Sequence, residues 1–180
     1  PFEGFTAFND NGFTVGNNGG TNRAPNDYVA WVWKAGDHDD NLPQINTNGT
    51  TDSIVSVNDA AGFSIVKFPV TNTSINVGHG LSAAPDMIIW KNLDSVDNWY
   101  VYHKDLSSPN TQWLNLNLDS TATTNATYNF SSVTSDTFTT HLFAGSGTNN
   151  VVAYCWYSVT GHSSIGSYTG SGYTGKTITT

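Results

Sequence analysis

The chain repeats part of its own sequence, and an internal repeat constrains the fold more than any other sequence feature. The segment Asn11–Thr14, a loop rich in glycine and asparagine, and the apolar run Tyr28–Trp33 follow one another near the start. The same order recurs in Asp136–Thr139, a similar loop, and Val151–Trp156. This pattern predicts a modular array of β-domains, an organisation more typical of fibres and adhesive surfaces than of compact enzymes.

A second recurrence has a different spacing. The apolar run recurs after 123 positions (28 to 151), whereas Ser64–Phe68 recurs as Ser164–Tyr168 after 100. An inserted linker explains the difference and predicts that the chain was cut from a longer array. The expected parts are the C-terminal part of a preceding repeat (1–36), an acidic polar linker (37–61), a central β-sandwich repeat (62–158) and the truncated start of a following repeat (159–180).

Short runs of β-branched and aromatic residues, bounded by Gly, Asn, Asp and Pro, follow one another along the chain. Such runs predict strands, and no segment has helical periodicity over more than one turn. Strands are expected at 13–15, 28–34, 63–68, 74–77, 87–91, 99–103, 113–118, 128–130, 137–142 and 151–158, with 53–57 as a further candidate edge strand. The pattern predicts an all-β sandwich or barrel with essentially no helix.

The charge balance excludes several classes of partner. The net charge is −8, and the six lysines and arginines are scattered without forming a basic patch. We therefore expect no nucleic-acid partner and no anionic membrane surface. No apolar run is long enough to span a bilayer, so membrane insertion is not expected. The single cysteine, Cys155, lies in an apolar run and is expected to be a buried, inert thiol.

Seven blocks occur in a fixed order along the chain: Phe13–Gly16, Tyr28–Gly36, Ala61–Val66, Val77–Leu81, Pro85–Asn92, Trp99–Lys104 and Ile165–Gly170. Together they resemble a repeat domain of tailed bacteriophages, especially marine phages. Such proteins are described as tail-fibre or virion structural proteins with a lectin-like β-sandwich. The sequence departs from the pattern where Ile178–Thr180 stops early and where Phe138–Leu142 is looser than its counterpart at Phe13.

The resemblance implies an antiparallel β-sandwich of the jelly-roll type, concanavalin- or laminin-G-like. It also implies a place on a virion, where homo-oligomeric copies of the chain and other virion proteins would be the partners, and a role in host contact. It supplies no catalytic residues. The sequence itself contains no Gly-x-Ser-x-Gly elbow, and Glu3 is the only glutamate available for a glycosidase pair. We therefore expect no enzymatic activity.

Candidate binding residues are few, and each has a structural alternative. Asp37, Asp39 and Asn41 place oxygen ligands at alternating positions, as calcium loops do. The same residues equally fit a solvated acidic linker. Calcium is therefore the one candidate cofactor, and the alternative is that the chain binds no cofactor. Trp99 and Trp113 lie close to polar turns and are expected to be partly exposed, which makes them the candidate glycan contacts.

Three further side chains are expected to have structural roles. His79 lies between two glycines and is expected to pack over a tight turn rather than bind a metal. Trp33 and Trp156 are expected in the core.

Two hypotheses for the function follow. The first is a non-enzymatic structural module of a phage tail fibre or other appendage, used in assembly and host-surface attachment. The second is a carbohydrate-binding, lectin-like module that recognises host surface glycans and depends on calcium. A binding module should have a concave, exposed, aromatic-lined site, whereas a structural module should bury its aromatic side chains.

Overall fold

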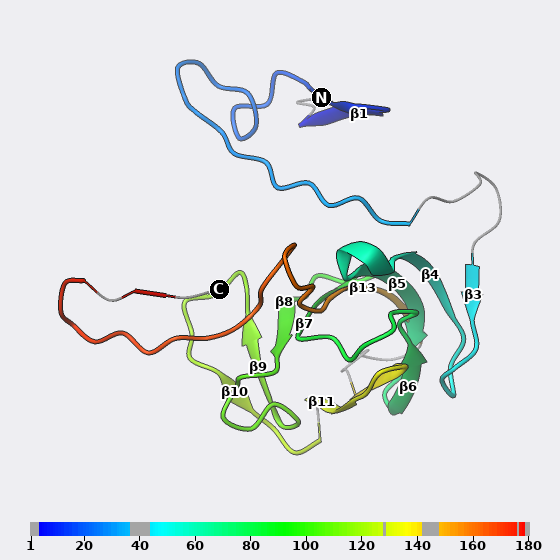
Figure 1. Ribbon diagram of the computed structural model, residues 1–180. Coiled ribbons are helices and arrows are strands. Elements are labelled where there is room, and N and C mark those ends of the chain that lie inside the picture. Colours follow the sequence, from blue (N-terminus) through cyan, green and yellow to red (C-terminus); the bar gives the residue numbers. More distant parts are fainter. Residues whose placement is uncertain (1–3, 37–43, 128, 142–147, 176, 179–180) are drawn as a thin grey trace. The chain divides into compact units, whose positions relative to one another are not determined.

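The computed structural model describes residues 4–36, 44–127, 129–141, 148–175 and 177–178. The chain divides into two compact units, Pro1–Trp33 and Lys34–Thr180. Figure 1 shows both units, coloured along the sequence.

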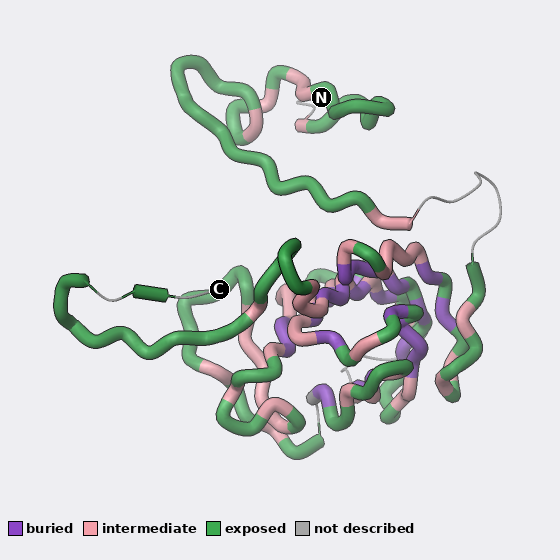
Figure 2. Tube along the Cα trace, viewed as in Figure 1, coloured by how far each residue is buried: buried purple, intermediate pink, exposed green. Residues whose placement is uncertain are grey.

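The first unit contains one hairpin. Strand β1 (Phe5–Asn9) pairs antiparallel with β2 (Gly12–Val15), and the rings of Phe5 and Phe13 meet edge to face with centroids 5.2 Å apart. None of the described residues from 4 to 36 is buried, as Figure 2 shows. The hairpin is therefore held by its own ladder and by a small exposed aromatic cluster.

The expected strand at 28–34 is wrong. These residues lie in no sheet of the described chain. Trp31 and Trp33 are 74% and 54% exposed, so the expectation that Trp33 lies in the core is also wrong. A strand exists only where a neighbour accepts and donates its backbone hydrogen bonds, and sequence propensity does not supply that neighbour.

The second unit contains two antiparallel sheets. The larger has the order β10-β9-β8-β7-β13-β5-β4-β3, and the smaller has the order β11-β12-β6. Their strands are β3 (Gln44–Asn46), β4 (Ser53–Asn58), β5 (Phe63–Val70), β6 (Ser74–Gly78), β7 (Met87–Asn92), β8 (Trp99–His103), β9 (Gln112–Asn115), β10 (Thr123–Thr124), β11 (Asn129–Val133), β12 (Thr137–His141) and β13 (Asn149–Trp156).

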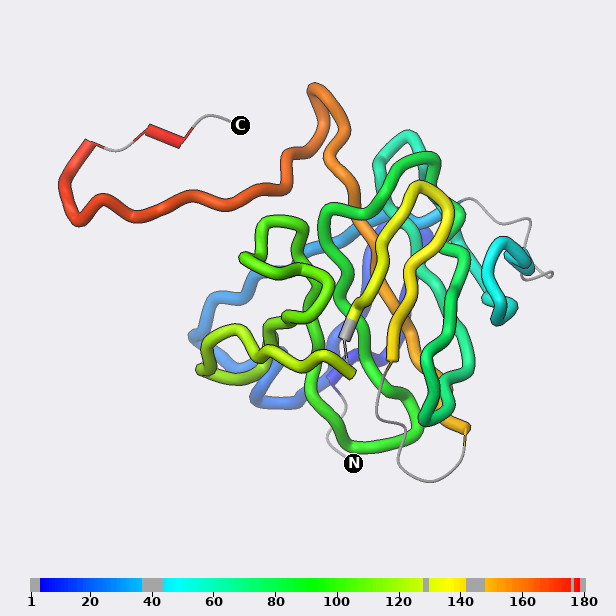
Figure 3. The backbone as a smooth tube through the Cα atoms, turned by 90° about the horizontal axis from the view of Figure 1, so that it is seen from below, coloured from blue at the N-terminus to red at the C-terminus, as the bar shows by residue number. Residues whose placement is uncertain are grey.

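The two sheets pack face to face around an aromatic core. Phe138 of β12 meets Phe68 of β5 with ring centroids 5.6 Å apart, and Phe130 of β11 lies 5.6 Å from Tyr102 of β8. In Figure 3 the β11–β12 hairpin, drawn in yellow, lies over the strands of the larger sheet. The described residues contain only one helical turn, the 3₁₀ turn Asp59–Ala61. The prediction of an all-β, antiparallel β-sandwich is confirmed.

Strand β13 occupies the middle of the larger sheet. It pairs with β5 on one side and with β7 on the other. Val151, Ala153 and Cys155 face the core and are fully buried, and Trp156 is 9% exposed. Cys155 lies in the core, as expected, and Trp156 is buried, as expected, but on the opposite face of the sheet, where it stacks on Phe63 at 5.1 Å between ring centroids. The uninterrupted apolar run reflects a strand with neighbours on both edges and cover on its core face.

Strands β3 and β4 lie within the range predicted as an acidic linker. Residues 54–58 pair with β5, and β3 rather than β4 forms the edge. The inward side chains of β4 include Ser53, whose hydroxyl donates to the Gly78 carbonyl at 2.7 Å. A polar residue that finds a partner can face the core. The strand predicted at 53–57 is therefore present, but it lies inside the sheet rather than at its edge, and β3 was not predicted. Strand β9 also ends at Asn115, before the predicted limit of 118.

Candidate functional site

Three aromatic rings form a row across the outer strands of the larger sheet. Trp90 of β7 stacks on Tyr100 of β8 at 4.5 Å between centroids, with planes 12° apart. Tyr100 in turn lies 6.3 Å from Trp113 of β9. Exposure rises along the row, from the buried Trp90 through the half-buried Tyr100 and Trp113. The row thus runs from the core to a ring that solvent can reach.

Polar groups fix the middle of this row. The Tyr100 hydroxyl donates to the Asp97 carboxylate at 2.7 Å, and Lys91 Nζ donates to the Asp97 backbone carbonyl at 2.9 Å. Burial, together with the hydrogen bond to Asp97, raises the pKa of Tyr100. The phenol therefore stays protonated and acts as a positioned donor, because removing its proton would place a second negative charge beside Asp97.

The two predicted glycan contacts do not lie on one face. Tyr100 pairs with Asn115, and Val101 pairs with Leu114. Because side chains alternate along a strand, Trp113 lies on the Tyr100 face, whereas Trp99 lies on the opposite face of the sheet. Both tryptophans are half-buried, so the expectation of partial exposure is confirmed. They cannot form one aromatic platform.

Two hollows among the described residues of the second unit bear on the expected sugar site, and neither of these two is lined by a Phe, Trp or Tyr side chain. One has a volume of about 530 Å³ and follows the β7–β8 turn at residues 91–97. In this turn the Asp94 carboxylate accepts two hydrogen bonds from Asn150, at 2.6 and 2.9 Å. These bonds lower the pKa of Asp94 and tie the turn to β13. The carboxylate therefore has a structural role here.

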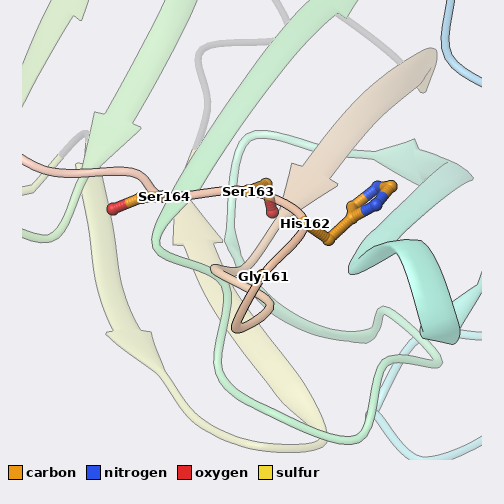
Figure 4. A pocket seen from close by; sticks show the side chains of 4 residues that line it. All are labelled: Gly161, His162, Ser163 and Ser164. Carbon is orange, nitrogen blue, oxygen red and sulfur yellow. The ribbon is translucent and has the colours of Figure 1, made fainter.

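The other hollow has a volume of about 340 Å³ and is lined by residues 161–164, in the loop after β13. Figure 4 shows that the side chains of His162 and Ser164 point away from each other. A nucleophile and its base must instead meet at hydrogen-bond distance. This loop does not present such a pair.

A second serine near the end of β13 is fully engaged by structural hydrogen bonds. Ser158 Oγ donates to Asp86 at 2.6 Å and accepts the Ile165 backbone N–H at 2.9 Å. Lys104 Nζ lies 3.0 Å from the other oxygen of Asp86. Although burial acts to raise it, these hydrogen bonds and the ion pair hold the pKa of Asp86 below its usual value. The cluster anchors the segment that follows β13.

His79 has the structural role expected for it. Its Nδ1 accepts the Leu81 backbone N–H at 3.1 Å, so its Nε2 carries the proton and donates to the Thr134 carbonyl at 3.2 Å. Burial lowers the pKa of this fully buried ring. Gly80 has a φ of 75°, which provides the tight turn that the flanking glycines predicted.

The candidate calcium ligands Asp37, Asp39 and Asn41 lie outside the described residues. In the ranges that the structure does describe, no group of three or more His, Cys, Asp or Glu side chains is placed to hold a metal ion. The same ranges contain no helix with the length and apolarity needed to cross a membrane.

The internal repeat extends to the hydrogen-bond register of the hairpins. Adding 125 to the residue numbers of three pairs in the first hairpin gives three pairs of the second. The pairs are Phe5↔Val15, Ala7↔Thr14 and Phe8↔Phe13 in β1–β2, and Phe130↔Thr140, Ser132↔Thr139 and Val133↔Phe138 in β11–β12. Both ladders shift register at the same place, before Ala7 and before Ser132. Residues 5–15 are thus a second copy of the β11–β12 hairpin.

The amino-acid sequence shows the recurrence of Phe13 and of the apolar run, but it does not show this shared irregularity. A bulge leaves one residue without a partner, and only the register of both strands reveals it. The recurring Phe-Thr pairs at 13–14 and 138–139 were the available signal.

The sequence matches a family described as a domain of unknown function (DUF7483) over residues 2–179. The chain belongs to this family. No curated protein and no solved structure matches it.

Proposed function

We propose that this member of the DUF7483 family is a non-enzymatic structural module of a phage virion. It would act in a tail fibre or another appendage, where sandwiches of one kind assemble in series and contact the host surface. Its sandwich would be of the lectin-like, jelly-roll type found in concanavalin and laminin-G domains. Other copies of the chain and other virion proteins would be its partners.

One observation carries this proposal. The chain contains one whole sandwich and, in residues 5–33, a second copy of the β11–β12 hairpin followed by a β13-like run. Neighbouring modules of one kind would repeat elements in this way. The buried aromatic side chains in the core of the sandwich also support the structural hypothesis.

Immunogold labelling tests the proposed location. Antibodies raised against residues 44–178 should decorate an appendage on particles of a phage that encodes the chain. Electron microscopy of the same particles before and after antibody adsorption with free chain provides the control. Labelling restricted to infected-cell debris, with bare particles, would overturn the proposal.

A second candidate function is glycan recognition, which the half-exposed Trp113 beside Tyr100 favours. Aromatic faces flanked by polar groups are typical of sugar sites, and the Tyr100 hydroxyl and the Asp97 carboxylate to which it donates lie next to this ring row. A glycan array probed with the wild-type chain, Trp113→Ala and Trp99→Ala separates the two faces of the sheet. Binding lost only in Trp113→Ala supports the aromatic row as the site, and no binding with or without calcium excludes this function.

A further inference from the structure

We propose that residues 28–33 of one copy of the chain pair as an antiparallel strand with residues 163–168 of a second copy. The pairing would use the register that joins β13 to β5 within the sandwich. This inference rests on the proposed assembly in series, and it specifies the contact that would link one copy to the next.

The template for the contact is the β13–β5 ladder. The six pairs of this ladder that involve the apolar run are Val151↔Phe68, Val152↔Lys67, Ala153↔Val66, Tyr154↔Ile65, Cys155↔Ser64 and Trp156↔Phe63. Val151, Ala153 and Cys155 face the core, while Tyr154 and Trp156 stack along the other face at 6.2 Å between ring centroids. A strand in this position needs apolar residues on both faces.

Residues 28–33 meet that requirement without forming a strand. Trp31 and Trp33 occupy the positions of Tyr154 and Trp156 in the recurrence, and Ala30 occupies that of Ala153. The run is apolar on both sides, and all six residues are exposed. Isolated exposed apolar residues need no explanation, but a contiguous exposed run marks an interaction surface.

The hairpin before this run strengthens the assignment. In the sandwich, β11–β12 packs over the larger sheet and precedes β13 in the chain. In the first unit, its register copy β1–β2 precedes residues 28–33. The exposed run therefore follows the same element that β13 follows, so the first unit carries the β11–β12–β13 portion of a second sandwich.

Residues 163–168 supply the matching β5-like strand. Ser164, Ile165 and Tyr168 recur from Ser64, Ile65 and Phe68. No described residue of this segment is buried, and Tyr168 is 70% exposed. The hydrogen bond from the Ile165 N–H to Ser158 anchors its start to the sandwich. The segment is thus held at one end and available beyond it.

Transferring the β13–β5 register gives one set of expected pairs. They are Tyr28↔Tyr168, Val29↔Ser167, Ala30↔Gly166, Trp31↔Ile165, Val32↔Ser164 and Trp33↔Ser163. Tyr28 would meet Tyr168 and Trp31 would cover Ile165, so two of the three aromatic residues of the run have an apolar or aromatic neighbour directly across the ladder.

Cysteine cross-linking of the full chain tests this register. One copy carries Ala30→Cys and a second, differently tagged copy carries Gly166→Cys. A Cβ at Gly166 has room, because its nearest neighbour would be Asp105 Oδ2 at 3.8 Å. The native Cys155 is fully buried, and burial raises the pKa of its thiol to about 12, so it does not compete. The out-of-register control pairs Ala30→Cys with Gly170→Cys, whose position has no atom within 4 Å.

We expect the mixed disulfide between positions 30 and 166 to form at least tenfold faster than that between positions 30 and 170. Equal rates would overturn the proposed register. A chain carrying both Ala30→Cys and Gly166→Cys provides a further arm. A disulfide formed only within single chains would overturn the assignment to a second copy.

The two proposals fail separately. Cross-linking in register without labelling of virions would leave the strand contact standing and remove the virion function. Labelled virions without the in-register cross-link would support the virion function and overturn the strand contact.

Discussion

Two regions of this molecule share one sequence pattern but differ in their burial and strand pairing. Residues 130–156 and residues 5–33 both contain a hairpin with one register shift, a loop and an apolar run. In the first region Phe138 is fully buried and the run is the central strand β13. In the second, Phe13 is 38% exposed and the run lies in no described sheet.

The comparison separates local from non-local structure. A hairpin pairs residues close in sequence, so its ladder forms in both regions with the same register. The apolar run must pair with strands distant in the sequence, and only β13 has β5 and β7 beside it. Equal sequence patterns therefore give equal structure only as far as the neighbouring strands are also present.

The largest expected effect comes from placing a charge at the equivalent alanines. Ala153→Asp buries an unpaired carboxylate in the centre of the sheet and should lower the free energy of unfolding by at least about 4 kcal/mol. Ala30→Asp, at an exposed position, should change it by less than about 0.5 kcal/mol. Urea unfolding followed by circular dichroism measures both. A large effect of Ala30→Asp at low protein concentration would contradict the expected difference between the two alanines, because it would show that residues 28–33 are already buried in the single chain.

The next effect separates the two hairpins. Phe138 contacts Phe68 and Phe130 in the core, so Phe138→Ala should lower the free energy of unfolding by about 3–4 kcal/mol. Phe13 contacts the exposed Phe5 cluster, and Phe13→Ala should cost about 1 kcal/mol or less. Differential scanning calorimetry of the two variants provides the measurement. Similar losses would mean that the N-terminal hairpin packs as tightly as its copy.

The elements predicted correctly are those whose apolar residues are buried, and whose backbones are paired, in the folded chain. The all-β class and the strands around β7, β8 and β13 follow from apolar alternation bounded by turn residues. The run at 28–34 was mispredicted because its pattern is that of a paired strand, and pairing is a property of distant residues. Residues 53–57 were predicted as an edge strand within a linker, whereas β4 lies inside the sheet, and the hydrogen bond that satisfies the inward Ser53 hydroxyl is seen only in the folded chain.

A third prediction concerns the turn of the β11–β12 hairpin. His79 donates its ring N–H to the Thr134 carbonyl, and its backbone N–H donates to the Asp136 carbonyl. These two bonds hold the β11–β12 turn to the end of β6, which His79 directly follows. Burial holds the pKa of His79 below 6.5, and the folded chain therefore binds fewer protons than the unfolded chain below that pH. Stability is fully present above pH 6.5 and is lost as the pH falls toward the folded-state value.

The expected slope between pH 6.5 and 5 is at most about 1.4 kcal/mol per pH unit for this one proton. In His79→Gln this slope should flatten, while stability at pH 7.5 should fall by about 2 kcal/mol because buried partners lose a hydrogen bond. Urea titrations at several pH values check both. An unchanged slope in the variant would show that other groups cause the pH dependence.

The candidate site shows the same limit of sequence reasoning. The partial exposure of Trp99 and Trp113 was predictable from the polar turns beside them. Their placement on opposite faces was not, because it depends on the β8–β9 register that pairs Tyr100 with Asn115. Equally, the stack of Trp90 on Tyr100 joins two strands whose register the sequence does not state.

The smallest expected effect lies just beyond the two apolar runs, where Ser158 recurs as Ala35. Ser158→Ala removes the hydrogen bond to Asp86 and the acceptor of the Ile165 N–H, and it should cost about 1–2 kcal/mol. The loss stays small because Asp86 keeps its ion pair with Lys104. Hydrogen exchange should show faster exchange of the Ile165 amide, whereas the reciprocal Ala35→Ser should alter stability by less than about 0.5 kcal/mol. Unchanged exchange at Ile165 would mean that another contact anchors the start of the 163–168 strand, and the proposed link between copies would then depend on that contact instead.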